Sequence, residues 1–129
     1  MIVSIPKELL ERLEAAAAAS APEEACGLLL GEEGAFTIAD CVVTHNVTQQ
    51  DKASHFEVNP SIHMKLQRQA REGGPDIIGV WHSHPNGVAA LSATDRRQST
   101  ELNWIWLVTA LRAGLCKTAV YVASPTDSH

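Results

Sequence analysis

The sequence predicts an α/β sandwich, because segments with helical periodicity interleave with short apolar segments that favour strands. Neither an internal repeat nor a linker-like segment interrupts this alternation. The chain has 129 residues, 45% of them hydrophobic, which is enough to bury a core of its own. We therefore expect residues 1–129 to form a single domain.

Two long helices and one short helix are expected. Over residues 6–20, leucine and alanine recur at helical spacing while charged residues fill the other face, and a proline follows soon after. A second helix begins at Pro60 and runs to about residue 72, where two glycines and a proline stop it. The third and shorter helix is predicted over residues 92–101, after a loop at 85–91.

The strands are predicted from short runs rich in Val, Ile, Leu and aromatic residues. A hairpin is expected around the turn at residues 32–34, and another around Gly114. The run that ends in His84 is apolar at its start, which indicates a buried strand. The predicted strands cover residues 25–31, 35–44, 55–59, 77–84, 104–110 and 117–123.

The motif His82-Ser83-His84 indicates a metal site. Two histidines that are two residues apart on a strand project from the same face, so both imidazoles can reach one ion, while Ser83 points away. Asp95 follows after a loop and offers a carboxylate from the first turn of the predicted third helix. Two histidines and one carboxylate leave a fourth zinc position for water, as in catalytic zinc sites.

Each part of this pattern also has a purely structural explanation. A histidine pair at a strand end is commonly a surface or hydrogen-bonded pair, and Ser92 with Asp95 is an ordinary helix start. A hydrolase would need a general base, for which Glu23 and Glu24 are the candidates. Acidic residues between a proline and a strand are mostly solvated, so the residues alone do not decide this point.

Three segments together are similar to the JAMM (MPN+) metalloprotease family. They are Glu24-Ala-Cys-Gly-Leu-Leu-Leu-Gly, Gly79-Val-Trp-His-Ser-His-Pro and Ser92-Ala-Thr-Asp95. Their order matches a glutamate, then His-x-His-Pro, then Ser-x-x-Asp, and the likeness covers roughly residues 3 to 123. It implies a JAB1/MPN domain, which is a cytidine deaminase-like α/β/α sandwich with a mixed central β-sheet.

The resemblance also implies the roles of the site residues. It makes His82, His84 and Asp95 ligands of Zn²⁺, Glu24 the general base and Ser92 the donor to the oxyanion. Glu24 is preferred over Glu23 because it stands two residues before Cys26, as in the family motif. The implied reaction is hydrolysis of an amide bond by metal-activated water, without an acyl-enzyme.

The implied substrate is a ubiquitin-like sulfur-carrier protein whose Gly-Gly C-terminus carries residues to be trimmed. The short chain leaves little room for the insertions that grip two ubiquitins, which disfavours a linkage-specific deubiquitinase. Three alternatives remain: a phage-tail or cell-wall peptidase of the same fold, a non-catalytic MPN scaffold, and a RadC-like role in DNA repair. Scaffold members lose ligands, whereas every ligand of the motif is present here.

Charge and composition narrow the partners further. The formal net charge is −5 and basic residues are scattered, so nucleic acid is not expected to bind. The N-terminus turns polar after five residues, which argues against a signal peptide or a membrane span and favours a cytoplasmic protein. The three cysteines are widely spaced and are expected to be reduced, with Cys26 in a buried strand. The sequence leaves the oligomeric state open.

Overall fold

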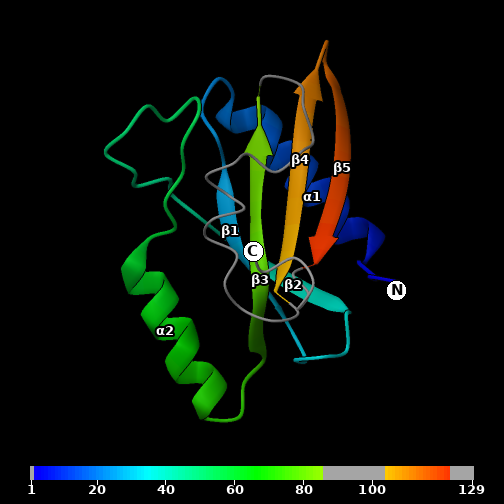
Figure 1. The fold of residues 1–129 in the computed structure, drawn as a ribbon, viewed down its shortest axis with the longest axis vertical. Helices are drawn as coiled ribbons and strands as arrows, with labels where there is room; N and C mark the ends of the chain where they lie inside the picture. The colour runs from blue at the N-terminus through cyan, green and yellow to red at the C-terminus, as the bar shows by residue number, and fades with distance from the viewer. Residues whose placement is uncertain (1, 86–103, 123–129) are drawn as a thin grey trace, which may run out of the picture.

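The computed structural model describes residues 2–85 and 104–122, shown in colour in Figure 1. The predicted helix at 92–101, the loop beyond Pro85, and both Ser92 and Asp95 lie outside these residues. The elements follow in the order α1 (Lys7–Ser20), β1 (Cys26–Gly31), β2 (Ile38–Thr44), α2 (Pro60–Arg71), β3 (Asp76–His84), β4 (Ile105–Arg112) and β5 (Leu115–Val122).

The five strands form one mixed sheet in the order β2-β1-β3-β4-β5, with β3 at its centre (Figure 1). Strands β3 and β4 run parallel, whereas the other three neighbouring pairs are antiparallel. A parallel pair needs a long crossover connection, and here that connection is the segment between His84 and Ile105. The predicted mixed sheet is therefore confirmed.

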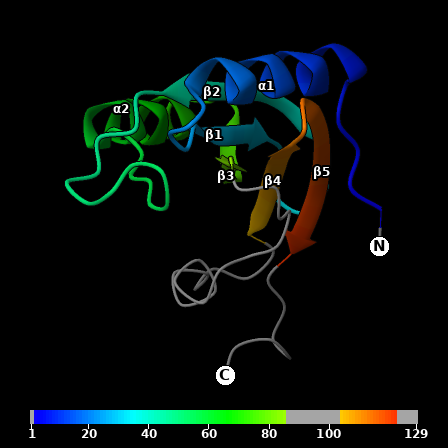
Figure 2. The same cartoon turned by 90° about the horizontal axis from the view of Figure 1, so that it is seen from above.

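Helix α1 covers one face of the sheet, and Figure 2 shows it lengthwise along one side of the strands. Its buried face consists of Leu9, Leu13 and Ala17, as the helical spacing predicts. These side chains pack in one cluster with Leu29 of β1 and Trp81 of β3. Alanine favours the helix and, at position 17, is small enough to be wholly buried against the sheet.

Helix α2 covers the opposite face. Its buried residue Leu66 clusters with Leu28 and Leu30 of β1, which flank the Leu29 that faces α1. Successive side chains of a strand point to opposite faces, so the apolar run of β1 supplies both cores. The Asn59 side chain caps α2 by accepting a hydrogen bond from the Ser61 N–H at 2.9 Å. The α/β/α arrangement is thus confirmed.

Two predictions about strands are wrong. Residues 55–59 form no strand. The His55 carbonyl accepts a hydrogen bond from the Asn46 side chain and the Glu57 N–H donates one to it, so neither group pairs with a neighbouring strand. Strand β2 begins at Ile38 rather than at residue 35, because Phe36 has a φ of 55°, which an extended strand does not allow. In the described part of the chain, no helix is both long and apolar enough to span a membrane.

Candidate metal centre

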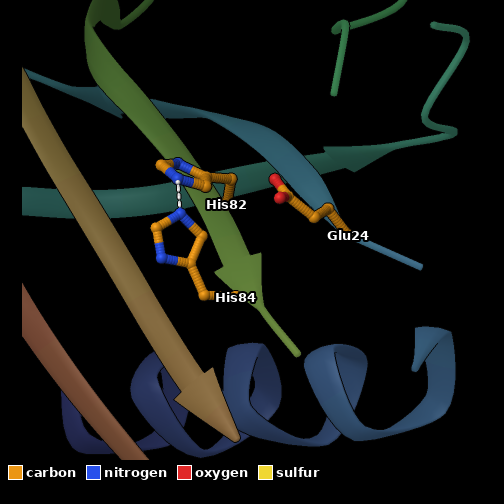
Figure 3. Close-up of side chains that lie close together, drawn as sticks. All are labelled: Glu24, His82 and His84. Atoms are coloured by element: carbon orange, nitrogen blue, oxygen red, sulfur yellow. Dashed lines mark hydrogen bonds between the residues drawn. The ribbon is translucent and has the colours of Figure 1, made fainter. Parts of the chain in front are cut away.

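The centre of the site is the end of β3, where His82 and His84 project from the same side of the strand (Figure 3). Their Nε2 atoms are 2.8 Å apart and their ring centroids 4.6 Å apart. The alternation of side chains along a strand explains why residues two apart meet in this way. The sequence prediction that both imidazoles reach one point is confirmed.

Glu24 joins the two histidines from the segment that leads into β1. Strand β1 is antiparallel to β3 with Cys26 opposite His82, and this register carries the preceding residues alongside the end of β3. The Glu24 carboxylate points toward the imidazoles in Figure 3. One carboxylate oxygen and one nitrogen from each histidine all lie within 4.8 Å of one another.

The cluster is almost closed to solvent: 6% of Glu24, none of His82 and 9% of His84 is exposed. Such deeply buried polar groups need partners, because burial removes their hydration. Three convergent nitrogen and oxygen donors are a donor set that zinc accepts. The residues present therefore fit a metal ion such as zinc, with two imidazole nitrogens and one carboxylate as possible donors.

Two aromatic side chains hold the His82 ring. Phe56 stacks on it with ring centroids 4.5 Å apart and planes 15° apart, while Trp106 meets it edge-on at 6.1 Å and 89°. Contacts on a face and an edge restrict rotation of the imidazole. The Trp106 Nε1 atom is buried and finds no hydrogen-bond partner among residues 2–85 and 104–122.

Trp81 and Ser83, the neighbours of His82, belong to the other side of β3, as predicted. The Trp81 indole N–H donates to Thr109 Oγ1 at 3.0 Å within the α1 side of the core. The Ser83 hydroxyl accepts the Ala25 N–H at 2.7 Å, and the Ser83 N–H donates to the Ala25 carbonyl at 3.0 Å. Ser83 thereby ties the histidine strand to the residue that follows Glu24.

Cys26 is a buried strand cysteine, as predicted. Its sulfur lies 3.7 Å from Thr44 Oγ1 and 3.8 Å from the Glu57 carbonyl oxygen. Burial raises the pKa of this thiol to about 11. These contacts make Cys26 a packing residue beside the site.

The structure brings together three of the five predicted site residues: Glu24, His82 and His84. It does not test Ser92 or Asp95, which lie outside the described residues. Glu23, the rejected alternative base, is exposed. Glu24 is therefore the only one of the two candidate bases that the described structure places in the cluster.

Sequence reasoning missed Asn46 and Phe56. Phe56 touches His82 directly, and Asn46 binds the Glu24 carbonyl oxygen at 3.0 Å. Both lie between β2 and α2, Asn46 at the start of a polar stretch and Phe56 in the run predicted as a strand, and no motif spacing marks either as part of the site. A lone asparagine just after a strand, followed by a long polar segment, is the only signal available, and it is weak.

A family model for prokaryotic homologs of the JAB domain matches residues 6–121, so the chain belongs to that family. Among characterised relatives, a desampylase of Haloferax volcanii is 28% identical over 100 residues, which span 78% of this chain and 71% of that protein.

Two solved structures share the fold. A protein from Desulfitobacterium hafniense is 24% identical with a TM-score of 0.79, and the match covers 97% of this chain and 86% of that chain. A JAB1/MPN domain protein from Archaeoglobus fulgidus is 17% identical with a TM-score of 0.58, covering 91% and 88%. These neighbours support the fold that the motif implied.

Proposed function

We propose that this protein is a zinc-dependent peptidase or isopeptidase that hydrolyses an amide bond at the Gly-Gly C-terminus of a ubiquitin-like protein. The observation that carries the proposal is the buried cluster of Glu24, His82 and His84 in a JAB-family fold. A site built from a closely spaced carboxylate and two imidazoles suits metal-assisted hydrolysis.

In this proposal His82, His84 and Asp95 hold the zinc ion. The first two have converging nitrogens, and Asp95 is assigned from its place in the motif. When bound, zinc supplies Lewis acidity, which makes a water acidic near neutral pH and polarises a carbonyl group. The Phe56 and Trp106 rings keep the first imidazole in place and exclude water from it.

Glu24 is the general base. Its carboxylate takes a proton from the attacking water and later gives it to the leaving amine nitrogen, so the C–N bond breaks with no covalent enzyme intermediate. The position of Glu24 beside both imidazoles supports this role. We assign Ser92 as a hydroxyl donor to the oxygen that becomes negatively charged, on its place in the motif.

The likeness to a desampylase supports a substrate of the ubiquitin-like class. Within that class we propose a sulfur-carrier protein from which the enzyme trims residues attached after the second glycine. A non-catalytic scaffold would not need a buried carboxylate beside two imidazoles, so the cluster favours an enzyme.

The test is a cleavage panel with the zinc-loaded protein. It contains sulfur carriers that end in Gly-Gly followed by one amino acid, and ubiquitin-like proteins joined through Gly-Gly to a lysine side chain. Mass spectrometry should find cleavage after the second glycine in at least one group, and the Glu24→Gln variant should leave every substrate intact. If no member of the panel is cleaved, the proposal is wrong.

A further inference from the structure

We infer that Asn46 is a positioning residue of the metal centre, because its one amide group fixes both the backbone of Glu24 and the segment that presses Phe56 against His82. The effect on metal binding rests on the proposed function, whereas the effect on the geometry of the cluster does not.

The Asn46 side chain uses its full hydrogen-bonding capacity. Its Nδ2 donates to the carbonyl oxygens of Glu24 at 3.0 Å and His55 at 2.9 Å. Its Oδ1 accepts the N–H groups of Thr48 at 3.2 Å and Glu57 at 3.0 Å. An amide has two N–H donors and one oxygen with two lone pairs, so all four places are filled. Neither a carboxylate nor an aliphatic side chain of this size can replace it.

One end of this network fixes Glu24. The Glu24 carbonyl accepts from Asn46, and the Glu24 N–H donates to the Lys52 carbonyl at 2.7 Å. Both backbone groups of the proposed base are therefore held by the segment between β2 and α2. The next residue, Ala25, is held by Ser83. The direction of the Glu24 carboxylate thus depends on where Asn46 places that segment.

The other end fixes Phe56. Asn46 binds the residue on each side of it, His55 through its carbonyl and Glu57 through its N–H. A further bond from the Val47 N–H to the Glu57 carbonyl, at 3.0 Å, closes this part of the segment. The ring between these two anchor points stacks on His82. Loss of the amide should therefore release the stacking contact and the base together.

Asn59 provides a matched control. It is also an asparagine of the same segment whose side chain accepts a backbone N–H, that of Ser61. Its side chain caps α2. Asn59→Ala should lower the stability through the lost helix cap and leave the site unchanged. Asn46→Ala should also change the stacking on His82 and the zinc affinity, and these changes should exceed what its loss of stability explains.

The first readout is the NMR spectrum of the His82 ring protons in metal-free protein. A phenyl ring stacked at 4.5 Å shifts these protons upfield. The shift should vanish in Phe56→Leu, which removes the ring, and decrease strongly in Asn46→Ala, while Asn59→Ala keeps it. The signals are assigned by their absence from His82→Ala. This measurement needs neither zinc nor substrate.

The second readout is zinc affinity, measured by competition with a coloured chelator. Outer contacts of metal ligands typically contribute 10- to 100-fold in affinity, so we expect Asn46→Ala to weaken zinc binding by roughly that factor. Asn59→Ala should bind like the unmodified protein. If the Asn46→Ala variant does not fold, the Asn46→Asp variant is used in its place. The aspartate keeps an acceptor oxygen for the N–H groups of Thr48 and Glu57 but has no N–H donors.

The outcomes separate this inference from the proposed function. A folded Asn46 variant that keeps both the upfield shift and the zinc affinity overturns the inference. An unmodified protein that fails to bind zinc contradicts the proposed function, and the proton shifts then still decide whether Asn46 positions Phe56. Equal effects of Asn46→Ala and Asn59→Ala on both readouts would reduce Asn46 to a general stabilising residue.

Discussion

The Nε2 atoms of His82 and His84 face each other at 2.8 Å, although the two rings are tilted by 59°. A neutral imidazole has one N–H and one bare nitrogen, so one ring donates to the other in this arrangement. Two nitrogen atoms that already lie this close together need little reorganisation to reach one ion.

Replacement of the base and of a ligand should have different effects. Glu24→Gln keeps the shape of the side chain and should keep bound zinc, while kcat falls at least about 100-fold through loss of general-base catalysis. His82→Ala should lose both zinc and activity. Elemental analysis of the purified variants and the cleavage assay measure the two effects. Full turnover by Glu24→Gln would contradict the role assigned to this residue.

Metal removal should abolish activity reversibly. After dialysis against a chelator the protein should cleave nothing, and added zinc should restore the rate. Zinc at 100 times its Kd should also stabilise the fold by about 2.7 kcal/mol, because it binds only the folded state. A thermal melt would detect this rise in the unmodified protein and find none in His84→Ala. Activity that survives complete metal removal would rule out a metal-dependent reaction.

Gly79→Ala should destabilise the sheet that carries the histidines. A Cβ at this position would clash with the carbonyl oxygen of Ile105, because β3 and β4 approach closely there. We expect a loss of about 3 kcal/mol or more in urea denaturation. Gly34→Ala is the comparison: no described residue has an atom within 4 Å of the added Cβ, and the φ of 82° costs about 1–2 kcal/mol. Equal losses would argue against the close approach.

Ser83→Ala should weaken the hydrogen bonding between β3 and the segment before β1. The substitution leaves the Ala25 N–H buried without its 2.7 Å acceptor, which costs about 1–3 kcal/mol. Ser54→Ala is a matched control, since the Ser54 side chain is exposed and its hydroxyl bonds to the ring of its neighbour His55, and the effect should stay below about 0.5 kcal/mol. Chemical denaturation distinguishes the two, and a neutral Ser83→Ala would contradict this prediction.

The ion pair of Arg12 and Asp40 should make a small, pH-dependent contribution. The Arg12 hydrogen bond at 2.7 Å, helped by the Cys41 N–H, lowers the pKa of the Asp40 carboxyl. A lowered folded-state pKa means that the stabilisation is present above the unfolded value near 4 and is lost as the pH falls through the folded value.

Both side chains are more than half exposed, so Arg12→Ala should cost only about 0.2–1 kcal/mol at pH 7 through the ion pair. The difference from the unmodified protein should shrink in acid and in high salt. The difference in stability that remains in acid reflects the hydrogen bond from Arg12 to the Cys41 carbonyl, because a backbone carbonyl does not titrate. Denaturation curves at pH 7 and pH 3 measure this, and a difference that grows in acid would contradict the assignment.

The sequence by itself determined the sandwich, the helices that became α1 and α2, and the histidine pair. Their signals are local: helical spacing placed Leu9 and Leu13 in the core, and alternation on a strand brought His82 and His84 to one face. The roles proposed for Glu24, Ser92 and Asp95 come from the resemblance to a family motif, in which the order along the chain is as specific as the residues.

Only the tertiary structure decided how the site is held. The extended run at residues 55–59 looks like a strand, but Asn46 takes hydrogen bonds that a strand would use for its neighbour. The stacking of Phe56 on His82 and the bond from Asn46 to Glu24 join segments far apart in sequence. Periodicity reports which face of an element is buried, whereas such side-chain contacts depend on the packing of the whole chain.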